Sequence, residues 1–118
     1  MTRLDSIAPC PQKPNCVSTL ATDAHAIAPI PFRSTPAEAM QTLLAILKEI
    51  PRTTIVFADE SVVRAEFRTL VFRFVDDGVF VVDEESHAIH FRSAARTGTY
   101  DFGVNRKRME TIRARFQR

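Results

Sequence analysis

The residues of this sequence with the clearest chemical potential are arginines near its C-terminal end. Arg92 and Arg96 lie four positions apart in a segment that alternates with a period of two, so both side chains project from one face of a strand. A helix is predicted to begin soon afterwards, with Asn105 as its N-cap, and the free N–H groups of a first helical turn attract anions. Guanidinium groups make bidentate contacts with carboxylates and phosphates. The pattern predicts a non-enzymatic binding module for a small anionic ligand or an acidic protein partner.

Further residues of the same region enlarge the predicted site. The predicted ligand-binding set is Arg68, Arg73, Arg92, Ser93, Arg96, Asp101, Asn105, Arg106 and Arg108. The same arginines can instead pair with acids of the chain, such as Glu66, Asp101 and Glu110, and brace the loop that follows Arg96. The alternative hypothesis is therefore a structural or protein-interaction domain with internally paired arginines.

A second alternative is a hydrolase or transferase that uses Ser93 or a cysteine together with a histidine. Metal binding is not expected, because the chain has two cysteines and three scattered histidines. His87 and His90 lie three apart in a predicted strand and point to opposite faces. No cofactor is expected, since the three glycines match neither a Walker nor a dinucleotide-binding pattern.

Composition limits the classes of protein that remain. The chain has 118 residues, 45% hydrophobic and 25% charged, which is typical of one folded domain rather than a disordered tail. Its formal charge is only +2, and the aromatic residues of the predicted sheet face the helices, so nucleic acid is an unlikely partner. No transmembrane segment is predicted. The absence of a leader predicts a cytoplasmic protein, or a periplasmic or exported one if a leader was removed.

The two cysteines, Cys10 and Cys16, lie six positions apart in a proline-rich stretch. A pair this close can form a small disulfide loop, whereas a reducing compartment would keep both residues as free thiols. The spacing makes the pair a disulfide candidate and leaves both redox states open.

One amphipathic helix is predicted from the capping signals that precede it. Thr35 is the expected N-cap, Pro36 the first helical residue and Glu38 the partner in a capping box. The helix should end near Ile50, because Pro51 follows. Its apolar stripe comprises Met40, Leu43, Leu44 and Leu47.

Residues 53–96 alternate with a period of two and predict four or five antiparallel strands, with a hairpin turn at Asp76-Asp77-Gly78. The face predicted to be buried carries Phe67, Phe72, Phe74, Ile89 and Phe91, and the open face carries Arg64, Arg68, Arg73, His90 and Arg92. A second helix follows, with an apolar stripe of Met109, Ile112 and Phe116. The prediction is one α+β domain, with two helices on one face of the sheet, an irregular arm at 1–34 and a core at 35–118.

Three stretches resemble a known family. The first, similar to a Cys-Pro-x-x-Pro-Asn-Cys-Val-Ser opening, is Cys10-Pro-Gln-Lys-Pro-Asn-Cys-Val-Ser18. The second, similar to an Arg-Ser-x-Ser-Arg-x-Gly-x-x-Asp-x-Gly-x-Asn-Arg-x-Arg-x-Glu signature, is Arg92-Ser-Ala-Ala-Arg-Thr-Gly-Thr-Tyr-Asp-Phe-Gly-Val-Asn-Arg-Lys-Arg-Met-Glu110. The third, similar to a Phe-Val-Asp-Asp hairpin, lies within Phe72-Arg-Phe-Val-Asp-Asp77.

These motifs are those of the bacterial and plastid family catalogued as domain of unknown function 1499. The resemblance implies no particular activity. It does imply that six residues form one unit: Arg92, Arg96, Asp101, Asn105, Arg106 and Arg108. Many relatives are exported or membrane-attached, which would suit paired cysteines. Two positions depart from the pattern, since Ala95 replaces a usual serine and Val79 a frequent glutamate.

Overall fold

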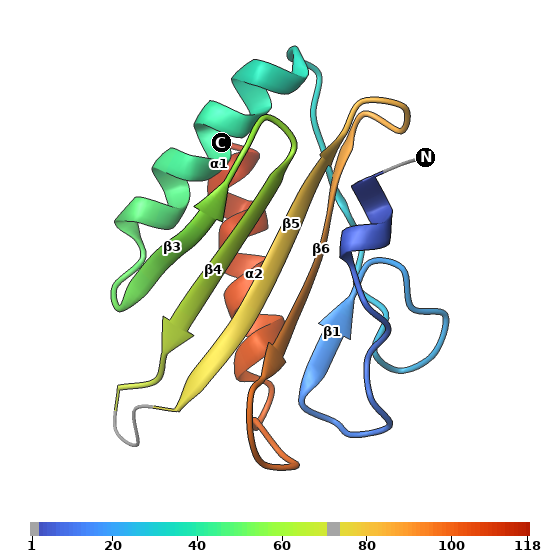
Figure 1. Cartoon of the computed structure of the whole chain (residues 1–118), viewed down its shortest axis with the longest axis vertical. Helices are drawn as coiled ribbons and strands as arrows, with labels where there is room; N and C mark the ends of the chain where they lie inside the picture. Colours follow the sequence, from blue (N-terminus) through green and yellow to red (C-terminus); the bar gives the residue numbers. More distant parts are fainter. Residues whose placement is uncertain (1–2, 71–73) are drawn as a thin grey trace.

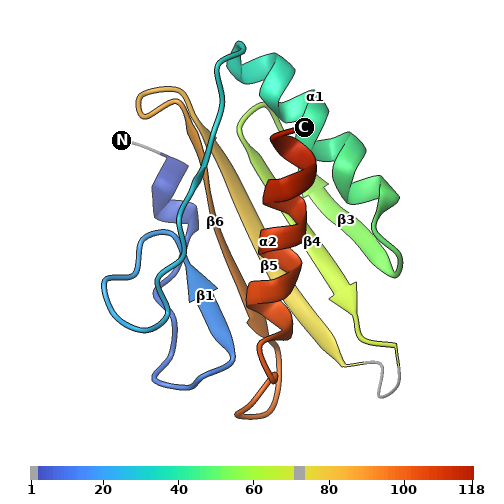
Figure 2. The same ribbon diagram turned by 180° about the vertical axis from the view of Figure 1, so that it is seen from behind.

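Two helices lie side by side on one face of an antiparallel sheet in the computed structural model of the chain, which describes residues 3–70 and 74–118 (Figures 1 and 2). This arrangement confirms the predicted α+β class. The elements in chain order are η1 (Arg3–Ser6), β1 (Cys16–Ser18), β2 (Ile30–Pro31), α1 (Pro36–Glu49), β3 (Thr53–Ala58), β4 (Val62–Arg68), β5 (Val75–Asp83), β6 (Ala88–Ala95) and α2 (Val104–Phe116).

The sheet has six strands in the order β1-β6-β5-β4-β3, and β2 pairs with another part of β6. The prediction of four or five strands is therefore low, because β1 and β2 come from the N-terminal arm that was expected to be irregular. These strands have three and two residues, too few to show a period-two pattern. Their hydrogen-bond partners lie in β6, far along the chain, so tertiary contact creates them.

The first helix begins as its sequence predicts. The Thr35 hydroxyl accepts a hydrogen bond from the Glu38 backbone N–H at 3.2 Å, and the Glu38 carboxylate accepts one from the Thr35 N–H at 3.4 Å. This capping box is confirmed. The helix ends at Glu49, one residue before the predicted end.

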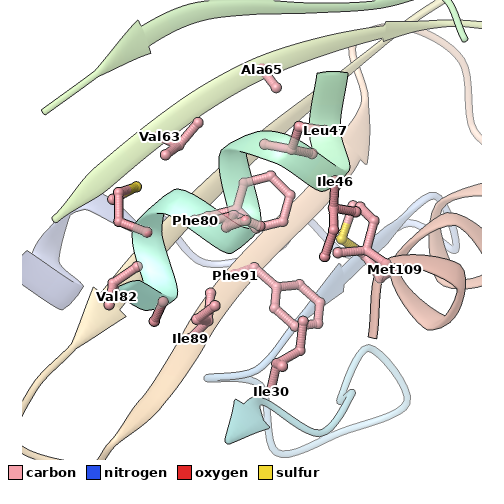
Figure 3. Close-up of a cluster of buried hydrophobic side chains, with 14 of the residues drawn as sticks. Ile30, Ile46, Leu47, Val63, Ala65, Phe80, Val82, Ile89, Phe91 and Met109 are labelled. Carbon is pink, nitrogen blue, oxygen red and sulfur yellow. The ribbon is translucent and has the colours of Figure 1, made fainter. Parts of the chain in front are cut away.

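The main hydrophobic core lies between the helices and the sheet (Figure 3). Phe67, Ile89 and Phe91 are at most 2% exposed and contribute to it, as predicted. Phe74 is 57% exposed and is not part of this core, so its predicted burial is wrong. The predicted positions Phe72 and Arg73 lie outside the described residues.

The predicted hairpin turn at residues 76–78 is wrong, because all three lie inside β5. Asp76 pairs with Phe67 of β4, and Gly78 pairs with Ala65. Gly78 is needed there for space, since a Cβ atom on it would lie 2.7 Å from Cε2 of Phe67. Asp-Asp-Gly is a local turn signal that sheet pairing and packing override.

The face of the sheet opposite the helices is only partly open. A second hydrophobic cluster covers part of it, in which Ile7 packs with Val62, Val79 and Val81 against Leu4 of η1. Arg64 and Arg68 are exposed on this face. His90 and Arg92 are half-buried, so the expectation of a fully open arginine-rich face is wrong.

A disulfide links Cys10 to Cys16, with their Cα atoms 5.8 Å apart, and fastens the chain before β1 to the sheet. We expect reduction to lower the free energy of unfolding by about 2 kcal/mol, because a loop of this length constrains the unfolded chain by roughly that amount. Denaturant unfolding with and without reductant measures the difference. The Cys10→Ser/Cys16→Ser double variant should be insensitive to reductant, and a wild-type protein equally insensitive would contradict the prediction.

Candidate functional site

A buried network of polar side chains joins β5, β6 and α2 beside the hydrophobic core. Asn105 and Ser93 are completely buried and Asp76 is 2% exposed. The Ser93 hydroxyl donates a hydrogen bond to Oδ1 of Asn105 at 2.5 Å, and Nη1 of Arg108 donates to the same oxygen at 3.0 Å. One asparagine side chain therefore connects a strand to a helix in the interior.

Arg108 supplies the positive charge of this network. Its Nη2 atom donates a hydrogen bond to Oδ2 of Asp76 at 2.8 Å, and the side chains of this ion pair are 11% and 3% exposed. The guanidinium carbon also lies 4.5 Å from the centre of the Phe67 ring. Burial of a charged group is costly unless a partner compensates it. Asp76 and Arg108 compensate one another, which explains an aspartate within a sheet.

Asp101 organises the start of α2. Its Oδ1 accepts a hydrogen bond from the Gly103 N–H at 2.9 Å, and its Oδ2 accepts from the Asn105 N–H at 3.1 Å and from Nδ2 of Asn105 at 2.8 Å. The N-cap residue is Gly103, in the left-handed conformation with a φ of 77°. The predicted N-cap role of Asn105 is wrong: the Asp101 carboxylate accepts from the N–H groups of Gly103 and Asn105, and the Asn105 side chain belongs to the interior network.

The two motifs at the ends of the chain meet at this network. Nδ2 of Asn15 donates a hydrogen bond to the Gly98 carbonyl at 2.8 Å, and Nδ2 of Asn105 donates to the Asn15 carbonyl at 3.5 Å. Asn15 is 3% exposed. The sequence does not predict Asn15 as a site residue, although its place beside Cys16 in the N-terminal motif is a signal for it.

Arg96 lies on the other face of the sheet, with two acidic partners. Its guanidinium donates hydrogen bonds to Asp77 at 2.6 and 3.0 Å and to Glu66 at 2.8 Å. These contacts, with Asp77 contributing most, raise the pKa of the Arg96 side chain. The group is exposed, so water screens the ion pairs and they add little stability.

Arg106 also has protein partners. Its two terminal nitrogens donate hydrogen bonds to the carbonyls of Ala26 and Ala24, each at 3.0 Å. In the same loop, Nδ1 of His25 lies 2.9 Å from the Asp23 carboxylate, and Nε2 lies 2.8 Å from the Lys13 carbonyl. The Lys13 carbonyl, followed by Asp23, raises the pKa of His25. Arg106 therefore fastens the N-terminal loop to α2.

Arg92 is the member of the predicted set with an unused polar atom. Its Nε is buried and has no hydrogen-bond partner within the described part of the chain. Burial lowers the pKa of Arg92, and the negative charge of Asp77 opposes this shift. Arg68 is exposed, and none of the described residues pairs with its guanidinium. Arg73 lies outside the described residues.

The structure thus divides the predicted site into separate groups. Ser93, Asp101, Asn105 and Arg108 form one network, whereas Arg96 and Arg106 have their own partners elsewhere. The Ser93 hydroxyl donates its hydrogen bond to the Asn105 amide in the interior, and both cysteines form a disulfide. Residues 3–70 and 74–118 contain no cluster of three or more metal-binding side chains.

The fold and the network define a small α+β domain in which the largely buried side chain of Arg108 joins α2 to the sheet. The chain belongs to the DUF1499 family, described as proteins of unknown function, since the family model matches residues 6–116. This match confirms the resemblance seen in the sequence. No curated protein and no solved structure matches the chain. In the part of the chain that is described, no helix is long and apolar enough to cross a membrane.

Proposed function

We propose that the protein is a non-enzymatic interaction domain whose signature arginines bind acceptors of the protein itself. The supporting observation is that Arg96, Arg106 and Arg108 each donate hydrogen bonds to two acceptors of the protein itself. An anionic ligand would have to displace these acceptors. At Arg108 this would leave the buried carboxylate of Asp76 without a cation, which is unfavourable.

The binding surface of this domain is the loop end, which we define as the exposed apolar residues where β4 meets β5 and β6 meets α2 (Figure 1). These residues are Leu70, Phe74, Tyr100, Phe102 and Val104. Phe102 is 95% exposed and Tyr100 is 70% exposed. Exposed apolar side chains gathered at one place mark interaction sites more often than scattered ones do.

The unused Nε of Arg92 supports a second candidate function, the binding of a small anionic ligand or an acidic partner. A phosphate or carboxylate oxygen would supply the missing acceptor. In the sheet register Val79 separates Arg92 from Arg64, an exposed arginine on the same face. This second candidate function needs only Arg92 and its neighbours. It does not need the arginines that already donate hydrogen bonds to acceptors of the protein.

A phosphate titration at low salt separates the two candidates. We expect the guanidinium N–H signals of Arg96, Arg106 and Arg108 in NMR spectra to be unchanged by millimolar inorganic phosphate, because the acceptors of these groups belong to the protein. The control is Arg92→Ala. A saturable shift that Arg92→Ala abolishes would replace the first proposal with the second, and saturable shifts at the other three arginines would show that these groups bind ligands.

A further inference from the structure

A hollow of about 250 Å³ lies within the loop end, between Thr69 and Phe74 on one side and the loop before α2 on the other. Phe74, Tyr100, Phe102 and Val104 line it, together with the acidic residues Asp76 and Asp101. Aromatic and aliphatic groups form most of its surface, and two carboxylates are the charged groups in it. Among the described residues, no lysine or arginine lines this hollow.

The charge of the hollow comes from Asp101. Asp76 has a cationic partner, since Arg108 lies 2.8 Å from it. Asp101 instead accepts hydrogen bonds from the N–H of Gly103 and from the N–H and Nδ2 of Asn105, all of which are neutral donors. The N–H groups at the start of α2 therefore offset part of its negative charge, and no ion pair within the described residues neutralises the rest.

The cations of the same signature segment have partners in other directions. Arg96 is bound to Asp77 and Glu66 on the opposite face of the sheet, and Arg106 is bound to carbonyls of the N-terminal loop. The hollow is thus a site of negative charge and aromatic surface beside a helix rich in arginine. The Asp101 carboxylate, which has no ion-pair partner among the described residues, disfavours an anionic ligand there.

The local backbone holds aromatic groups at this hollow in contact with water. Phe102 has a φ of 55°, in the left-handed region that bulky residues rarely adopt, and Gly103 follows with a φ of 77°. The hydrogen bond from the Gly103 N–H to Asp101 stabilises this turn. Residues in sparsely populated conformations cluster at active sites and ligand-binding segments.

We propose that this hollow binds an organic ammonium group, a quaternary or alkylated amine carried by a small free ligand. The positive charge of such a group is attracted by the faces of aromatic rings and by a carboxylate, while its methyl groups suit apolar walls. A divalent metal ion would need six or more oxygen ligands, which this surface does not offer. The inference rests on the proposed function, since it takes the loop end as the binding surface and names what the surface recognises.

Choline and its uncharged analogue 3,3-dimethyl-1-butanol test the inference, because the two molecules have nearly the same shape. In ¹H–¹⁵N NMR titrations of the whole chain we expect choline to shift the amide signals of Gly98 and Gly103 and to bind about tenfold more tightly than the analogue. Equal affinities would overturn the ammonium site but leave the loop end as an apolar binding surface. No shift with either molecule would overturn the hollow as a ligand site, and the phosphate titration would still decide the role of the arginines.

Variants locate the binding within the hollow. Tyr100→Leu removes an exposed ring and keeps an apolar side chain, and Asp101→Asn removes the charge and keeps an oxygen that caps the helix; each should weaken choline binding at least threefold. Phe57→Leu is the matched control, because Phe57 is an exposed aromatic on β3, and it should bind choline like the wild type. Unchanged binding in Tyr100→Leu and Asp101→Asn would overturn the proposal. Binding to phosphatidylcholine vesicles without binding of free choline would assign the surface to a membrane and also overturn it.

Discussion

Replacing Arg108 with alanine is expected to lower the free energy of unfolding by about 3–5 kcal/mol. The substitution removes the cation 2.8 Å from Asp76 and leaves that carboxylate, which is 2% exposed, uncompensated in the interior. It also removes the guanidinium from the Phe67 ring and from Oδ1 of Asn105. Since small domains are stable by about 5–15 kcal/mol, this loss is a large part of the total stability. Urea unfolding followed by circular dichroism measures the change.

Lys107→Ala is the matched control for this prediction, because Lys107 is the neighbouring cation on α2 and is exposed. It should change stability by less than about 0.5 kcal/mol. An Asp76→Asn/Arg108→Ala double variant should be more stable than Arg108→Ala alone, since it removes the buried negative charge. An Arg108→Ala variant as stable as Lys107→Ala would show that the ion pair does not hold α2 to the sheet.

Local signals predicted much of the fold because their causes are local. The capping box of Thr35 and Glu38 needs only four consecutive residues, and it forms as predicted. The alternation in β4 and β6 assigns Phe67 and Phe91 to the core, because burial alternates along residues 63–68 of β4 and residues 89–93 of β6. In both elements the sequence pattern and the tertiary packing favour the same structure.

The errors occur where a distant partner decides the outcome. Asp76 and Gly78 look like a turn in isolation, yet Arg108 neutralises the aspartate and the Phe67 ring occupies the space beside the glycine. The strands β1 and β2 exist because β6 offers them hydrogen bonds. None of these partners can be recognised from neighbouring residues alone.

The candidate site shows the same division. The sequence identified Ser93, Asp101, Asn105 and Arg108 as residues of one region, but it could not choose between ligand binding and internal pairing. That choice depends on acceptors such as the Asp76 carboxylate and the Asn15 carbonyl. Both are distant in the sequence, and the fold brings them to the network. The sequence did not predict Tyr100 and Phe102 as site residues, because they lie in a loop without a period, and it assigned Phe74 to the core.

The second large effect is expected at Asn105, the residue that connects most of the network. Asn105→Ala removes an acceptor from Ser93 and Arg108 and a donor to Asp101, and these groups are then buried or half-buried without their partner. Each unsatisfied buried polar group costs about 1–3 kcal/mol, so we expect a loss of roughly 3 kcal/mol in the free energy of unfolding.

The location of the damage distinguishes this prediction from a general loss of stability. Asn105 joins α2 to the Asn15 carbonyl and to Asp101 in the loop before the helix. The amides of residues 97–103 should therefore exchange hydrogen faster in Asn105→Ala, even under conditions where the sheet stays protected. Thr111→Ala, an exposed polar position on the same helix, should change neither stability nor exchange by a measurable amount. If Asn105→Ala unfolds only globally, with no local loosening of the loop, then Asp101 alone holds the loop in place, and the network stabilises the core without controlling the loop end.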